Sequence, residues 1–246
     1  MRSTYIAFIL IGLFICSCTP KASGPISKPT TPGTPDNYDT PKPVKLAIVL
    51  SVDQMRYDYF ERFGDLFQHG LKELAEKGTL YTQAYHEHSM TATAPGHATL
   101  STGCYPMHHG IIENNFYDQK SQETIYAVVD PNAKLIGGAQ EGPGVSPKNL
   151  MRKALGDHLK KTSGKSKVFS VAIKDRTSIL LGGKKPDHAF WFDNGSLKFI
   201  SSSYYGTKLP AYLDEMTAEK LYAAEMEKGW HKKLPEEAYS RSREDN

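Results

Sequence analysis

Two apolar runs place the strongest limit on how this chain can fold. Residues 46–52 (LAIVLSV) are apolar at every position but Ser51, and residues 167–173 (KVFSVAI) are apolar at most positions. A strand with one solvated face would alternate apolar and polar side chains, whereas a strand buried on both faces reads as a continuous apolar run. Strands of that kind are typical of parallel sheets, so both runs predict strands of a mainly parallel sheet.

Helical and strand patterns alternate along the rest of the chain. Residues 65–77 have apolar residues at helical spacing, and Gly78 follows as a helix stop. A hairpin is predicted over 188–205, because Asn194-Gly195 supplies its turn. The remaining predicted elements are a strand over 79–86 and helices over 95–102, 148–164 and 209–230. Strands that alternate with helices predict an α/β domain.

Length sets the size of the fold, and the charge pattern argues against a nucleic-acid partner. The 246 residues are long enough for one α/β domain with a sizeable core. The formal net charge is +3, lysines are scattered, and no stretch interleaves basic with aromatic side chains. Nucleic-acid-binding proteins concentrate positive charge on one face, so we expect no nucleic-acid partner.

The N-terminal 44 residues predict export and a tether. Residues 1–17 hold an apolar run, IAFILIGLFI, that is too short to span a bilayer and is typical of a signal peptide. The run ends in ICSC, which resembles a bacterial lipobox, so we expect cleavage before Cys18 and lipidation of that cysteine; plain secretion is the alternative. Residues 18–44 are rich in Pro and Thr and predict an extended linker. We therefore expect a periplasmic or cell-envelope protein that a lipid anchors to the membrane.

Cysteine usage agrees with this processing. The chain has three cysteines. Cys16 would leave with the signal peptide, Cys18 would carry lipid, and Cys104 would remain as a lone thiol. No internal disulfide is then expected, even in an oxidising compartment.

Polar side chains follow both apolar runs, where α/β sheets place their ligands. Asp53 follows the first run, and its carboxylate could bind a divalent metal or cap the next segment. Lys174 and Arg176 follow the second run, two positions apart, and lie on one side of an extended chain. Together they could hold a dianion, Lys as a point charge and Arg as a planar fork. A solvated strand end would have the same sequence.

A hydroxyl-rich stretch, TATAPGHATLSTG (residues 91–103), predicts a helix start. Pro95 suits the first turn, and Gly96 permits close approach of the backbone. Thr93 would then face unpaired N–H groups at the positive end of the helix, which also suits a phosphoryl oxygen. Its hydroxyl could be a nucleophile if a base or metal activates it, or a plain helix cap. Asn114 could donate to a phosphate oxygen or occupy an ordinary loop.

Three motifs in order resemble one enzyme superfamily. VDQMRYDY, TATAPGHATLSTGCYPMHHGIIENNFYD and VAIKDRTSILLGG resemble the alkaline phosphatase superfamily. They are most similar to its threonine-nucleophile periplasmic phosphatases of the PafA type, which are related to type I phosphodiesterases/nucleotide pyrophosphatases. The resemblance covers essentially all of residues 45–246 and implies a three-layer α/β sandwich with a mainly parallel sheet.

The resemblance also implies a chemistry for the candidate residues. Matched position by position, Asp53 is a zinc ligand, and Thr93 is the nucleophile, a second zinc ligand and the site of a phospho-threonine intermediate. Asn114 contacts the phosphate, and Lys174 and Arg176 bind its oxygens. The implied activity is hydrolysis of small phosphate monoesters at a two-zinc site, since two cations favour a dianion over a diester.

The chain departs from the superfamily in its second half. The remaining zinc ligands of the superfamily include an Asp and a His four residues apart, an adjacent Asp-His pair and a late His. The only histidines after residue 176 are His188 and His231, and neither lies in a motif that matches these zinc ligands. Two zinc ions need about six to eight protein ligands, and only Asp53 and Thr93 can be assigned. We therefore expect the globular part to be the N-terminal part of a catalytic domain, incomplete at the C-terminus.

Such a chain is expected to bind zinc poorly and to show little activity alone. Two alternatives remain open at this stage. One is a nucleotide pyrophosphatase/phosphodiesterase, which shares the threonine nucleophile. The other is a non-catalytic surface lipoprotein that uses the same half-domain for binding.

Overall fold

A computed structural model describes residues 44–138, 142–217, 223, 227–229 and 231–240. The chain forms two compact units, Met1–Ser51 and Val52–Asn246. The predicted signal peptide, Cys18 and the predicted linker up to residue 43 lie outside the described residues. Within the described residues, no helix is both long and apolar enough to cross a membrane.

The first expected strand is absent. Residues 44–52 form no helix or strand, and Leu46, Ile48 and Leu50 expose 75, 80 and 75% of their surface. The prediction over 46–52 is therefore wrong for this structure. An apolar run reports a preference for burial, whereas a strand also needs a neighbour for its backbone hydrogen bonds, and none pairs with this run among the described residues.

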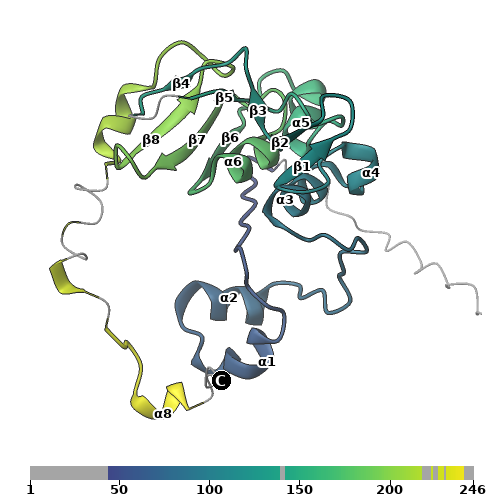
Figure 1. Cartoon of the computed structure of the whole chain (residues 1–246). Coiled ribbons are helices and arrows are strands. Elements are labelled where there is room, and N and C mark those ends of the chain that lie inside the picture. Colours follow the sequence, from purple (N-terminus) through teal and green to yellow (C-terminus); the bar gives the residue numbers. More distant parts are fainter. Residues whose placement is uncertain (1–43, 139–141, 218–222, 224–226, 230, 241–246) are drawn as a thin grey trace, which may run out of the picture. The chain divides into compact units, whose positions relative to one another are not determined.

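The larger unit contains the regular elements that Figure 1 labels. Its helices are α1 (Tyr59–Phe63), α2 (His69–Lys77), α3 (Thr93–Thr102), α4 (Pro106–His109), α5 (Leu155–Thr162), α6 (Asp175–Gly182) and α8 (Glu236–Tyr239), with 3-10 turns η1 (Gly64–Leu66) and η2 (Ala211–Glu215). Its strands are β1 (Asn115–Asp118), β2 (Glu123–Tyr126), β3 (Val129–Asp130), β4 (Leu135–Ile136), β5 (Gly144–Val145), β6 (Phe169–Ala172), β7 (His188–Asp193) and β8 (Lys198–Ser202).

A four-stranded sheet has the order β4-β8-β7-β6. β6 and β7 are parallel, with Ser170 opposite Ala189, as expected for strands joined through a helix. β7 and β8 are antiparallel and form the predicted hairpin, and β4 also pairs antiparallel with β8. Small antiparallel pairs, β1 with β2 and β3 with β5, lie outside this sheet. The structure thus confirms an α/β arrangement, although β6–β7 is the one parallel pairing among the described strands.

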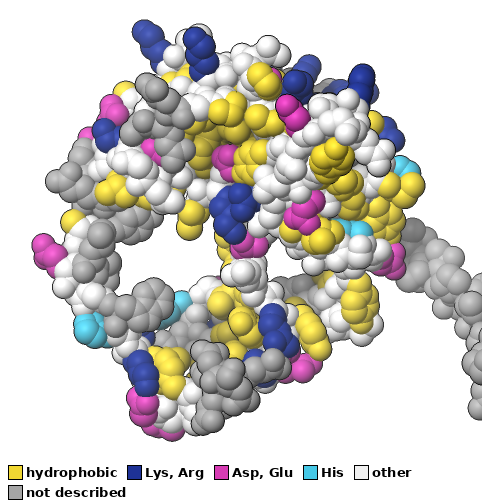
Figure 2. Space-filling model, viewed as in Figure 1, with side chains coloured by type: hydrophobic (Ala, Val, Ile, Leu, Met, Phe, Trp, Pro, Cys, Tyr) yellow, Lys and Arg dark blue, Asp and Glu magenta, His cyan; other side chains and the backbone are white. Residues whose placement is uncertain are grey.

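β6 lies at the edge of this sheet, and one of its faces is open. Phe169, Val171 and Ile173 expose 59, 55 and 75% of their surface, whereas Ser170 is buried. Burial on both faces is therefore wrong for this run, because among the described residues nothing covers the face that carries Phe169, Val171 and Ile173. Figure 2 shows hydrophobic side chains, in yellow, exposed on the viewed face.

Helices α3 and α6 form the centre of the packing. Ala94 and Ala98 of α3 and Ile179 and Leu180 of α6 are completely buried in one apolar cluster. Small side chains on α3 let the two helices approach closely, and the Ser101 hydroxyl donates to the Leu180 carbonyl at 2.6 Å. α6 is fastened to the sheet in turn, because the Ser178 hydroxyl donates to the carbonyl of Ser170 at 3.1 Å.

Other predicted elements differ in extent. The helix over 65–77 is divided into η1 and α2, and the helix over 148–164 begins only at Leu155. Residues 79–86 form no strand. In the predicted helix over 209–230 the structure has η2, and most of residues 218–230 lie outside the described residues.

Candidate functional site

Thr93 is the first residue of α3. The preceding Ala92 is extended and offers no side-chain cap. Asn114, which lies 20 positions from Ala94 along the chain, caps the helix instead. Its Oδ1 accepts a hydrogen bond from the Ala94 backbone N–H at 2.8 Å. With Oδ1 so used, the side-chain amide of Asn114 keeps its two N–H donors. The structure therefore brings Thr93 and Asn114 together at the start of one helix.

His97 stabilises the same turn. Its ring is buried, and its Nδ1 lies 2.7 Å from the Thr93 carbonyl oxygen. A carbonyl can only accept, so Nδ1 carries the proton. The helix ends at Gly103, whose φ of +65° is the left-handed conformation that glycine adopts readily.

Asp53 and Lys174 form an ion pair. The Lys174 ammonium donates to Asp53 Oδ2 at 2.5 Å, and the two side chains are 42 and 44% exposed. This hydrogen bond lowers the pKa of Asp53, and the charges of His97 and Arg176 lower it further. The resemblance implies that Asp53 binds a metal, but here the Lys174 ammonium is its positive partner.

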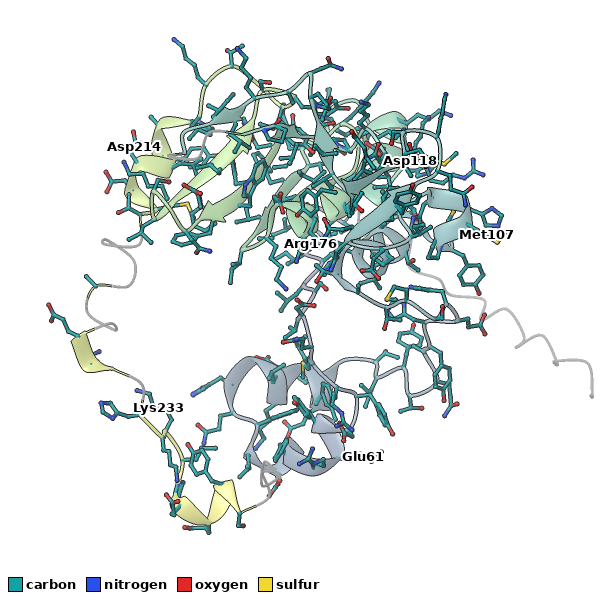
Figure 3. All side chains as sticks on the ribbon, viewed as in Figure 1. Glu61, Met107, Asp118, Arg176, Asp214 and Lys233 are labelled. Carbon is teal, nitrogen blue, oxygen red and sulfur yellow. The ribbon has the colours of Figure 1, made fainter. Side chains whose placement is uncertain are left out.

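Arg176 lies in the first turn of α6 and is labelled in Figure 3. Its Nη1 donates to the Tyr126 hydroxyl at 3.1 Å, and that hydroxyl donates to Asp175 Oδ1 at 2.5 Å. The backbone N–H of Arg176 donates to the same Oδ1 at 2.6 Å. Neither Tyr126 nor Asp175 is among the residues that the sequence predicts for the site. Asp175 could have been noticed between the two cations, but nothing in the sequence links Tyr126 to a segment 50 residues away.

The N-terminal ends of α3 and α6 lie at the same end of the helix pair. Ser101 and Leu180, both in the C-terminal halves, are hydrogen-bonded to each other. At the other end Asp53 is close enough to His97 and Arg176 for both to lower its pKa. Two helix N-termini and two cationic side chains favour an anion in this region, and the carboxylates of Asp53 and Asp175 offset part of that preference.

A hollow of 470 Å³ lies beside the cations. Tyr126, Lys174, Asp175 and Arg176 line one part of it, and Trp191 and Ile200 belong to its apolar part. Thr93 and Asn114 are not among its lining residues. The structure thus groups the candidate residues as two neighbouring sets, one at α3 and one at α6.

The described residues do not form a metal centre. Among them, no group of three or more His, Cys, Asp or Glu side chains could hold a metal ion. A zinc ion usually takes four ligands. Asp53 and Thr93 are too few, and Asp53 is already paired with Lys174.

Comparison with known proteins identifies the family. The sequence profile of the type I phosphodiesterase / nucleotide pyrophosphatase family matches residues 47–243. The chain belongs to this family. The match covers all but the first residue of the two apolar runs and every candidate residue of the folded part, which confirms the superfamily that the motifs resemble.

Members of this family named as alkaline phosphatases are similar over most of the chain. Alkaline phosphatase PafA of Elizabethkingia meningoseptica is 36% identical over 209 residues, which cover 84% of this chain and 38% of the relative. Alkaline phosphatase PhoV of Synechococcus elongatus is 36% identical over 203 residues, which cover 82% of this chain and 37% of the relative. The chain thus spans less than two fifths of the length of these curated relatives.

A solved structure shows the same fold. The crystal structure of alkaline phosphatase PafA superimposes with a TM-score of 0.75 and 35% identity, over 79% of this chain and 38% of that one. A variant of the same enzyme, in which a threonine, an asparagine, a lysine and an arginine are substituted, superimposes with the same TM-score of 0.75 and 33% identity. The α/β sandwich of the alkaline phosphatases is therefore the fold of the folded part.

Proposed function

We propose that this protein acts on phosphate monoesters, as an alkaline phosphatase, with Thr93 as the nucleophile. The observation that carries the proposal is that Lys174 and Arg176 lie at the start of α6, which packs against the helix that Thr93 begins, α3. A monoester above neutral pH is close to a dianion, which two cations and two helix dipoles stabilise better than the single charge of a diester.

The proposed reaction has two displacements. The Thr93 oxygen attacks phosphorus, the bond to the ester oxygen breaks, and the alcohol leaves with the proton of the Thr93 hydroxyl. Water then attacks phospho-Thr93 and releases inorganic phosphate. Such transition states are loose, so holding the phosphoryl oxygens is most of the work, which we assign to Asn114, Lys174 and Arg176.

The substituted relative supports this assignment of residues. Its threonine and asparagine are separated by the same number of residues as Thr93 and Asn114. Its lysine and arginine are two positions apart, like Lys174 and Arg176. These spacings agree with the motif matches in the sequence and support treating the four residues as one phosphate-binding set.

The two-zinc site that the resemblance implies does not fit the residues described. We expect the purified chain, dialysed after exposure to excess zinc, to retain much less than one zinc ion per chain, because Asp53 and Thr93 offer only two ligands. Elemental analysis by mass spectrometry measures this. Retention of one or two ions per chain would contradict the expectation.

We also propose that Cys18 carries the lipid anchor and that the protein resides in the periplasm or cell envelope. The lipobox-like ICSC and the Pro/Thr-rich linker support this. Metabolic labelling with a palmitate analogue tests it, since Cys18→Ser should remove the label. Label retained in Cys18→Ser would overturn the proposal.

Ligand binding separates the proposed activity from its nearest alternative without requiring turnover. Methyl phosphate is mostly a dianion at about pH 8, whereas dimethyl phosphate keeps one charge. If the proposal is right, the monoester binds at least about tenfold more tightly, a difference of about 1.4 kcal/mol. Equal or tighter binding of dimethyl phosphate would favour a phosphodiesterase. Any slow hydrolysis of p-nitrophenyl phosphate should be lost in Thr93→Val.

A further inference from the structure

Tyr126 lies between the two charged groups of a small, half-buried network. It is at the end of β2, and its hydroxyl meets α6 from a strand pair outside the main sheet. The hydroxyl donates to Asp175 and accepts from Arg176 Nη1, and the Arg176 guanidinium carbon lies 5.9 Å from the centre of the Tyr126 ring. Tyr126 therefore contacts the guanidinium through both its oxygen and its ring face.

The direction of these hydrogen bonds is fixed by chemistry. An ionised carboxylate can only accept, so the Tyr126 proton points to Asp175 and a lone pair of the oxygen is left for Arg176. Burial, together with the charge of Asp175, holds the pKa of Tyr126 well above its usual value. The Tyr126 hydroxyl thus keeps its proton through the alkaline pH range. Its hydrogen bonds to Asp175 and Arg176 therefore keep their directions over the same range.

The contact with Tyr126 leaves a defined edge of Arg176 available. Nη1 is used, whereas Nε is buried and has no hydrogen-bond partner among the residues that the structure describes. A buried donor without a partner is costly, by about 1–3 kcal/mol. An anionic oxygen at this edge would remove that cost, and the neighbouring Nη2 would allow a bidentate contact.

We propose that Tyr126, held by Asp175, is a positioning residue that fixes the Arg176 guanidinium so that its Nε–Nη2 edge faces a phosphoryl group. This inference rests on the proposed function and adds a residue to it. Tyr126 itself does not touch the phosphate. Tyr126 restricts the side-chain rotation of Arg176 before phosphate binds. The entropic cost of ordering Arg176 is then not added to the free energy of binding.

The test uses Tyr126→Phe, which keeps the ring and removes the hydroxyl. Tyr117→Phe is the matched control, because Tyr117 lies on the paired strand β1 and its exposed hydroxyl donates to Gln122 Oε1, away from Arg176. Both variants are made in the full chain. Thermal unfolding checks that each is folded.

Two readouts report on positioning rather than on stability. In Tyr126→Phe we expect the Arg176 Nε–H proton, assigned by its absence in Arg176→Lys, to exchange with water at least about tenfold faster. We also expect the affinity for inorganic phosphate to fall about five- to tenfold, with no further fall when Tyr126→Phe is added to Arg176→Ala. Tyr117→Phe should leave both unchanged.

The outcomes separate the inference from the proposed function. If Arg176→Ala weakens phosphate binding but Tyr126→Phe changes neither readout, the inference is wrong and the proposed function stands. If Tyr126→Phe lowers only the melting temperature, Tyr126 is purely structural and the inference is again wrong. If the wild type binds no phosphate, or Arg176→Ala binds it equally well, the proposed site fails and the inference fails with it.

Discussion

Alanine at both Lys174 and Arg176 is expected to lower the affinity for inorganic phosphate at least about 100-fold, or about 2.7 kcal/mol. A hydrogen bond to a charged group contributes about 1.5–3 kcal/mol, and Arg can make two such bonds to one phosphoryl group. Lys174 is held by Asp53 at 2.5 Å, so its contribution should be the smaller of the two. Titration calorimetry at fixed ionic strength measures the loss.

Arg152→Ala with Lys153→Ala is the matched control for this pair. These neighbouring cations are exposed, and their replacement removes the same charge from the chain. Phosphate binding should survive in the control. An equal loss in both double variants would mean that phosphate binding is not the property of a site at α6.

Lowering the pH from about 8 to about 4.5 is expected to reduce the free energy of unfolding by about 2.5 kcal/mol through His109 alone. His109 is completely buried, accepts from the Ile111 N–H through Nδ1 at 3.1 Å, and lies with Nε2 3.0 Å from the Thr99 hydroxyl oxygen. Burial lowers the pKa of His109 to about 4, and the charge of His88 contributes. Since Nδ1 accepts, the neutral ring carries its proton on Nε2.

The folded and unfolded chains take up a proton at His109 at different pH values, and this difference sets the direction in which the free energy of unfolding changes with pH. The unfolded chain takes up a proton at His109 near the ordinary value of about 6.5, whereas the folded chain resists until about pH 4. The stabilisation is therefore complete above about pH 6.5 and is lost as the pH falls. Denaturant unfolding of His109→Gln should show a pH dependence smaller by this amount, while His108→Gln, at an exposed neighbour, should behave like wild type. Identical profiles for wild type and His109→Gln would contradict the assignment.

Local signals in the sequence predicted the elements that local chemistry determines. Pro95 and Gly103 delimit α3 to within two residues, and Asn194-Gly195 turns the β7–β8 hairpin as expected. Each of these depends on backbone preferences of a few neighbouring residues, which a sequence states directly.

Features that depend on distant partners were not predictable in the same way. The run 46–52 has the composition of a strand but has no strand partner among the described residues. Asp53 was expected to face a metal, yet its described partner is Lys174, 121 positions away. Tyr126 gave no signal at all, because its importance comes from where β2 meets α6 in space. Residue spacing in the sequence predicted Lys174, Arg176 and Thr93 as site residues. It did not predict the groups that orient their side chains.

The central claim is that a phosphoryl group binds where α3 and α6 begin. A crystal structure of the chain with tungstate, a heavy analogue of phosphate, tests it most directly. The account predicts tungstate within hydrogen-bond distance of Arg176 and Lys174 and beside Thr93. A second hollow, of 430 Å³, is lined by Asp157 together with Lys153, Lys160, Lys161, Lys184 and Lys185. Tungstate found only there, with the start of α6 empty, would contradict the account.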